Sequence, residues 1–179
     1  GAAEEIWSAN KPPKGSRSFL ERINYIHQLS AQLPSASQRV VYTKAGNTIT
    51  AARVDDVDVI IDHKLYWAAT NTVDEARYLV GILNSAAVLE RVKPFMAVGL
   101  LGPRDVDKNV FRAFIQPYDA SNESHVALAE SVAEAEGAAS EVNVSGAKTF
   151  REKRKLIRAQ LEHKGLLSKI ETLVLDVVP

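Results

Sequence analysis

Carboxylates and amines on one short segment are the first groups in this chain that could perform chemistry. Asp62 and Lys64 stand two residues apart after the apolar run 57–61. An acid-x-Lys pair with an acid upstream is how many nucleases hold Mg²⁺, but its ligands must converge from different elements. The nearest upstream acids lie on the same segment, at Asp55, Asp56 and Asp58. A nuclease site therefore stays a weak alternative to a solvated turn that presents Lys64.

The sequence shows no other pattern that is typical of a metal site, a cofactor site or a catalytic triad. The sequence has no cysteine, and its four histidines show no i,i+4 pair, so we expect surface or hydrogen-bonded histidines and no metal site. Gly99 and Gly102 follow a predicted helix instead of a strand, which is the wrong context for a nucleotide-binding loop. No Ser-His-Asp arrangement stands out either. We predict no catalytic, cofactor-binding or metal-binding residue.

Binding chemistry is better represented, because basic and amide side chains gather on predicted turns. Arg and Lys can contact phosphates, and Arg or Asn can contact base edges in the major groove of DNA. Lys11, Lys14 and Arg17 add cations to the polar N-terminal segment. The predicted DNA-binding residues are Lys44, Asn47, Arg53, Lys64, Arg104, Lys108, Asn109 and Arg112.

Residues 148–158 form the most basic stretch, with six cations and one acid. Residues 119–141 carry six acids and no Lys or Arg. Opposite charges on neighbouring helices attract. We therefore expect the basic stretch to be a solvated helix face that pairs with the acidic helix, and DNA backbone contact is the alternative.

Local patterns predict the elements that would position these side chains in the first half of the chain. Pro12 and Pro13 indicate an extended arm over 1–17. A Ser18–Glu21 capping box starts a helix that Pro34 ends. The β-rich runs 39–43 and 48–54 flank a turn and predict a hairpin, and 57–61 predicts a third strand that 64–67 continues or follows.

The second half is mostly helical by pattern. Capping boxes at Thr72 and Thr149 start two helices, one expected to run to about Val92 and one to stop before Gly165. The Gly-rich segment 98–104 is expected to be a loop and 110–115 a strand. Residues 123–140 and 168–178 are further predicted helices.

These elements predict an α+β fold with a small, mostly antiparallel sheet, flanking helices and a C-terminal helical hairpin. We divide the chain into an arm (1–17), an α+β domain (18–142) and the hairpin (143–179). With 22 basic and 22 acidic residues the net charge is zero, so cations would have to cluster on one face to bind DNA. The missing initial Met suggests an excised fragment, and the absence of a signal sequence or long apolar run favours a cytoplasmic protein.

Several blocks together resemble the C-terminal region of adenine-specific DNA methyltransferases from bacterial restriction–modification systems. The resemblance covers roughly residues 18–178. It is most specific in Asp74-Glu75-Ala76-Arg77-Tyr78-Leu79 with Ile82-Leu83-Asn84-Ser85. The other blocks are 39–46 with 51–53, 61–67, 102–108, 115–119 with 125–128, and positions within 157–174.

This resemblance implies a target-recognition domain whose partners are double-stranded DNA and the catalytic methyltransferase domain of a parent chain. S-adenosylmethionine is implied for that parent. The fragment lacks the methyl-donor segment and the Asn-Pro-Pro-Tyr motif, and Asn10-Lys11-Pro12-Pro13 has an inserted Lys and no aromatic residue. We expect no catalysis from the fragment itself. The alternative function is a protein-interaction module that docks within the same enzyme system.

Overall fold

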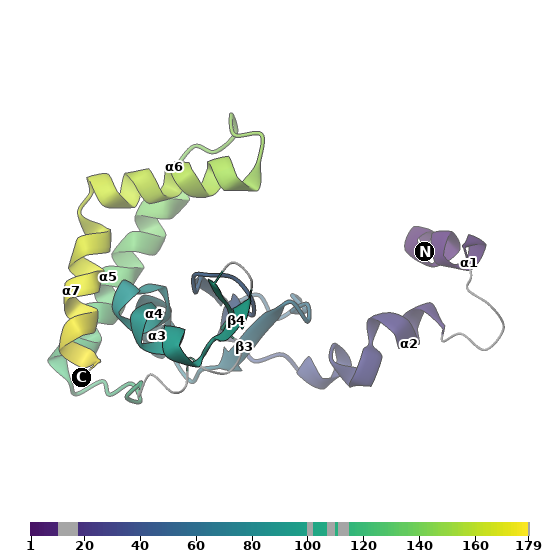
Figure 1. Ribbon diagram of the computed structural model, residues 1–179, viewed down its shortest axis with the longest axis horizontal. Coiled ribbons are helices and arrows are strands. Elements are labelled where there is room, and N and C mark those ends of the chain that lie inside the picture. Colours follow the sequence, from purple (N-terminus) through teal and green to yellow (C-terminus); the bar gives the residue numbers. More distant parts are fainter. Residues whose placement is uncertain (11–17, 100–101, 107–109, 111–114, 179) are drawn as a thin grey trace.

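The computed structural model describes residues 1–10, 18–99, 102–106, 110 and 115–178. Helices form a layer against one small antiparallel sheet, so the predicted α+β class is confirmed (Figure 1). Within these residues, no helix is both long and apolar enough to cross a membrane. The main core joins sheet and helices and includes Val40, Tyr42, Ile82 and Leu128.

The sheet has the strand order β2-β1-β3, with all neighbours antiparallel. Its strands are β1 (Arg39–Thr43), β2 (Ala51–Val54) and β3 (Leu65–Ala69), so the predicted hairpin is confirmed. The strand expected at 57–61 is wrong, because this segment forms turns around the buried side chain of Arg39. Two Arg39 nitrogens donate to backbone oxygens, Nη1 to Val59 at 2.9 Å and Nη2 to Asp56 at 2.6 Å.

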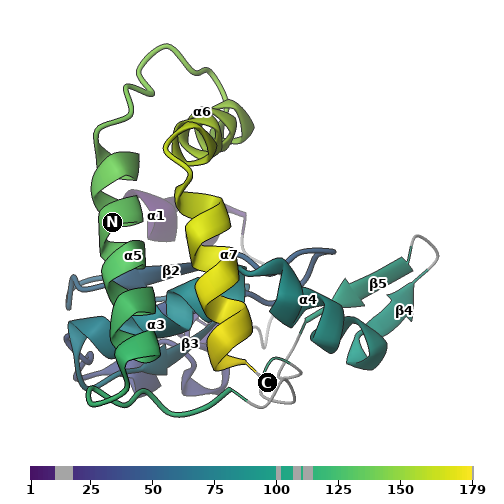
Figure 2. The same cartoon turned by 90° about the vertical axis from the view of Figure 1, so that its left-hand side faces the viewer.

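The helix layer consists of α3 (Val73–Asn84), α4 (Ala86–Val92), α5 (Glu123–Ser140) and α7 (Leu166–Val177). α3 packs closely on α5 at Gly81, where an added Cβ would lie 3.0 Å from side-chain atoms of Leu128 and Val132. α5 and α7 stand side by side (Figure 2).

The single helix expected over 73–92 is two helices. Ser85 takes an extended conformation between α3 and α4, and its Oγ accepts the Val88 N–H of α4 at 3.1 Å. The Glu171 carboxylate accepts the two preceding N–H groups, of Ala86 at 3.0 Å and Ala87 at 2.9 Å. These acceptors satisfy the free N–H groups at the start of α4. They therefore favour a new helix here over a continuation of α3.

At the C-terminal end, α6 (Phe150–His163) crosses beyond the ends of α5 and α7 (Figure 1). The capping box of Thr149 and Glu152 is present, and Gly165 has the positive φ of 70° that was predicted for the residue after the helix. Val174, Val177 and Val178 belong to the main core. The predicted boundary at 142/143 therefore crosses a shared core.

The N-terminal part differs from its prediction. Residues 2–9 are not extended but form α1 (Ala2–Ala9), and Pro12 and Pro13 lie outside the described residues. The long helix expected from Ser18 is only α2 (Phe19–Ile23), followed by η1 (Tyr25–His27) and η2 (Ser30–Gln32). Asn24 interrupts it, because its Oδ1 accepts the N–H groups of Leu29 and Ser30 at 3.0 and 3.1 Å.

A second hairpin occupies the segment that was expected to be a Gly-rich loop. After η3 (Lys93–Phe95), β4 (Ala97–Gly99) pairs antiparallel with β5 (Gly102–Asp105). The strand expected at 110–115 lies largely outside the described residues. Val106 and Val110 are both fully buried, so the chain returns to the core at these two points.

Candidate nucleic-acid interface

Three of the predicted DNA-binding segments meet at one end of the sheet. Thr43 pairs with Leu65 as the last pair between β1 and β3, and the Lys44 N–H then donates to the Lys64 carbonyl at 3.4 Å. The Lys44 carbonyl accepts the Val106 N–H at 3.1 Å. Lys44 thus joins the β1–β2 turn to the residues just before β3 and to the residue just after β5. We call this region the turn edge (residues 44–50, 62–64 and 106).

The turn edge presents exposed polar side chains. Lys44, Asn47 and Lys64 are all exposed, and neither lysine forms an ion pair within the described part of the chain. The Lys44 ammonium lies 5.2 Å from the centroid of the Tyr66 ring, which helps to orient it. Gly46 allows the turn with a φ of 139°.

Four of the predicted DNA-binding residues lie in the segment 104–112. Arg104 lies on β5, the strand that ends next to Val106, and only its backbone position is described. Lys108, Asn109 and Arg112 lie outside the described residues. Lys11, Lys14 and Arg17 of the arm do so as well.

Arg53 is placed differently from the other predicted residues. Its guanidinium donates to Glu136 at 3.1 Å, to Asp55 at 2.7 Å and to Gln38 at 3.2 Å. Its side chain is only 18% exposed. Burial alone would lower the pKa of Arg53, but the bonds to Asp55 and Glu136 raise it overall. Arg53 is thus committed to acids of its own chain.

Glu136 also binds a second arginine, and together they form the ion cluster (Arg53, Arg77 and Glu136). Arg77 Nε lies 3.0 Å from the second Glu136 oxygen and belongs to α3, whereas Arg53 belongs to β2 and Glu136 to α5. The ion cluster therefore ties the sheet to two helices.

Asp62, the acid of the possible nuclease pair, folds back on its own turn. One oxygen accepts the Lys64 N–H at 2.9 Å, and the other lies 3.2 Å from His63 Nδ1. The bond from the Lys64 N–H is the main reason that the pKa of Asp62 is lowered. No group of three or more His, Asp or Glu side chains that could hold a metal occurs among the described residues.

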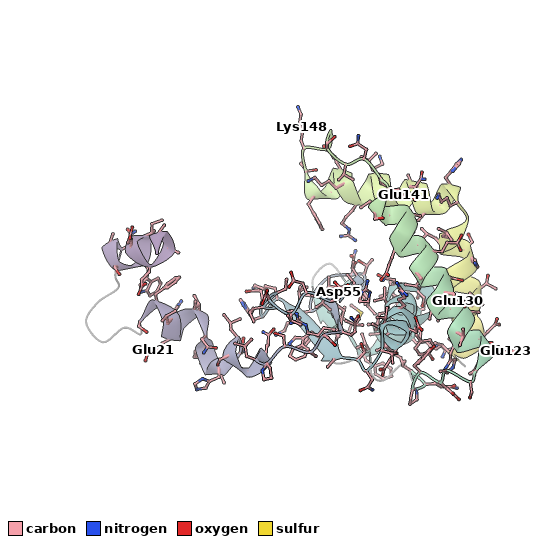
Figure 3. All side chains as sticks on the ribbon, turned by 180° about the vertical axis from the view of Figure 1, so that it is seen from behind. Glu21, Asp55, Glu123, Glu130, Glu141 and Lys148 are labelled. Carbon is pink, nitrogen blue, oxygen red and sulfur yellow. The ribbon has the colours of Figure 1, made fainter. Side chains whose placement is uncertain are left out.

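The basic stretch forms α6 and the loop before it, but the expected pairing with the acidic helix is wrong for residues 148–158. The acids of α5 and its C-cap bind other cations: Glu134 binds Lys169 at 3.0 Å and Glu141 binds Lys164 at 3.6 Å. Figure 3 shows Glu123 and Glu130 on the part of α5 that is farthest from Lys148. The helices cross, so that only the last turns of α5 come near α6.

A buried polar cluster supports the segment that leads into α5, and sequence reasoning did not predict it. The Tyr78 hydroxyl donates to the Gln116 carbonyl at 3.2 Å and lies 3.5 Å from His125 Nε2. His125 Nδ1 accepts the Asp119 N–H at 3.1 Å, which makes Nε2 the protonated nitrogen of the neutral ring. Burial raises the pKa of Tyr78 to about 12. Tyr78 and His125 both fall in the blocks that carry the family resemblance.

Comparison with models of protein families finds no matching family. Comparison with curated proteins and with solved structures finds no match either.

Proposed function

We propose that this chain is the DNA target-recognition domain of an N6-adenine DNA methyltransferase from a restriction–modification system. This proposal rests on the sequence resemblance and on one structural observation. The turn edge joins the β1–β2 turn and the residues before β3, which carry the predicted DNA-binding residues Lys44, Asn47 and Lys64, to Val106, which follows the strand of Arg104. The methyl transfer, and S-adenosylmethionine, belong to the catalytic domain of the parent chain.

The turn edge has suitable chemistry for a duplex. Two exposed lysines, one directly after β1 and one directly before β3, can each approach a phosphate, and Asn47 in the turn can donate to and accept from a base edge. The backbone bonds that join the segments fix their spacing, so the contacts need not be assembled on binding. In the parent enzyme such contacts would hold the site while the target adenine is flipped.

Binding of a short labelled duplex across a salt series tests this function. The 179-residue chain should bind, and log K should fall linearly with log salt. In the variant Lys44→Gln with Lys64→Gln, the slope should become shallower by about 0.9 for each phosphate that the variant no longer neutralises. The control, Lys93→Gln with Lys169→Gln, removes two lysines that are paired with Glu90 and Glu134 and should keep the parent slope.

Failure to bind the duplex at any salt concentration would refute a DNA-contacting surface on this chain. Equal slopes in the turn-edge variant and the control would show that the contacts lie elsewhere on the molecule.

A docking module is the second candidate, and the N-terminal segment favours it. The segment 18–33 extends away from the body of the fold, and several of its apolar side chains are largely exposed (Figure 1). They are Leu20, Ile23, Ile26 and Leu33. Such an exposed apolar group is typical of a protein-binding surface, and the catalytic domain of the parent chain is the proposed partner.

Co-purification of this chain with the separately expressed catalytic domain tests docking. Leu20→Ser with Ile26→Ser should abolish the complex and leave duplex affinity unchanged if the segment only docks. A complex that survives this change would argue against docking through the segment.

A further inference from the structure

The most basic stretch of the sequence lies on α6, and the proposed function leaves its surface unused. Its cations Arg151, Arg154, Lys155 and Arg158 follow i, i+3, i+4, i+7 spacing, which places all four on one side of a helix. All four are exposed, with Arg158 at 73%. This set defines the α6 face.

The acids of α6 neutralise little of this face. The Glu152 carboxylate folds back to the helix start, where it accepts the N–H groups of Lys148 at 2.7 Å and Thr149 at 3.2 Å. Glu162 forms an exposed pair with Arg158 at 2.9 Å. No acid of α5 binds a cation of the α6 face in the described part of the chain. The face keeps a net positive charge.

One contact ties this face to the turn edge. Arg154 Nη2 lies 3.3 Å from Thr50 Oγ1, and Thr50 is the last residue of the β1–β2 turn. The same turn carries Lys44 and Asn47. The N-terminal half of α6 therefore lies over the hairpin, as Figure 1 shows, although the two are more than one hundred residues apart in sequence. The contact therefore brings the N-terminal half of α6 next to the segment that carries Lys44 and Asn47.

We propose that the α6 face binds the phosphate backbone of the same duplex that the turn edge contacts. This inference rests on the proposed function and extends it. A DNA duplex carries one negative charge for about every 1.7 Å of its axis. Its phosphates can therefore contact the cations along α6 and those of the turn edge at the same time. Phosphate contacts from a helix set orientation, whereas base contacts from the turn set sequence preference.

The test compares two triple variants of the full chain, in each of which three cations are replaced. Arg151→Gln, Lys155→Gln and Arg158→Gln change the α6 face but keep Arg154, and Gln retains helix propensity. The control changes Lys93, Lys164 and Lys169 to Gln, all of which pair with acids of their own chain. Circular dichroism checks that both variants fold.

We expect the α6 variant to bind a mixed-sequence duplex about tenfold more weakly than the parent, with a shallower salt slope. The control should bind like the parent. The loss should be the same for duplexes of different sequence, since phosphate contacts carry no sequence information.

Other results overturn the inference in distinguishable ways. If the α6 variant and the control both bind like the parent, α6 does not contact DNA, while the proposed function stands. An equal loss in both triple variants would assign the effect to net charge and would also refute a specific role for α6. If the parent itself fails to bind, the proposed function fails together with the inference.

Discussion

The ion cluster and the α6 face contain the same kinds of cations, but the fold uses them differently. Arg53 and Arg77 are mostly buried and share the carboxylate of Glu136. The α6 cations are exposed, and only Arg158 among them has an acid partner in the described residues. A guanidinium that already donates to a half-buried acid is poorly available to an external phosphate. The difference separates cations that hold the fold together from cations that can bind a ligand.

The largest expected effect on stability comes from breaking the ion cluster. Glu136→Ala should lower the free energy of unfolding by about 2 kcal/mol, because it leaves two mostly buried guanidinium groups without their shared partner. Urea denaturation measures this change. The matched control is Glu134→Ala on the same helix, which removes only an exposed pair with Lys169 and should cost less than about 1 kcal/mol. An equal loss of stability in the two variants would mean that the buried ion cluster contributes no more than the exposed pair.

Sequence alone could not make this distinction among the cations. Arg53 and Lys64 both flank predicted strands, and both were predicted to contact DNA. Their difference depends on Glu136, which lies 83 residues from Arg53 in sequence and meets it only because α5 packs on α3, which in turn packs on β2. Local patterns correctly predicted the hairpin, two full capping boxes and the glycine after α6, since each depends on neighbours in the sequence.

The failures of prediction have the same physical origin. Residues 57–61 have strand-forming side chains, but the buried Arg39 guanidinium binds carbonyls of this turn segment. Residues 73–92 have one helical pattern, but Glu171 supplies acceptors for a second start at Ala86. The basic stretch and the acidic helix have opposite charges, but the two helices cross. Glu134 and Glu141 instead form ion pairs with Lys169 and Lys164, which lie outside the basic stretch. Tertiary contacts decided each case.

The next effect in size concerns the buried hydroxyl of Tyr78. Tyr78→Phe should lower the free energy of unfolding by about 1 kcal/mol near neutral pH, because the Gln116 carbonyl is left without its donor. The folded protein holds the pKa of Tyr78 at about 12, above its ordinary value of 10.0. A raised pKa means that the parent loses stability as pH rises from about 10 to about 12, while the Phe variant lacks this loss.

Denaturation midpoints of parent and Tyr78→Phe across this alkaline range measure the effect. The deficit of the variant should shrink as pH rises. A constant deficit would show that Tyr78 has the same pKa in the folded and the unfolded chain. Burial would then not raise the pKa of its hydroxyl.

A smaller effect is expected from Asp55, the exposed partner of Arg53. Its bond to Arg53 lowers the pKa of Asp55, so the carboxylate stabilises the fold above its unfolded pKa and this contribution is lost as pH falls through the lower folded value. Asp55→Asn should be slightly less stable than the parent at neutral pH and equal to it in strong acid. Asp58→Asn removes an exposed acid from the same segment without touching Arg53, and denaturation of both variants should show the pH-dependent deficit only for Asp55.

The smallest effect on stability should come from changes to the α6 face. This prediction is the sharpest test of the difference between the ion cluster and the α6 face. Neutralising Arg151, Lys155 and Arg158 removes repulsion between like charges at i+3 and i+4 spacing and also removes one exposed pair with Glu162, each worth only about 0.3 kcal/mol. The two changes oppose each other, so urea midpoints should match those of the parent. A cost close to that of Glu136→Ala would show that these cations stabilise the fold. A loss of DNA affinity without a loss of stability would show that the helix carries its mutually repelling cations for a ligand and not for its own packing.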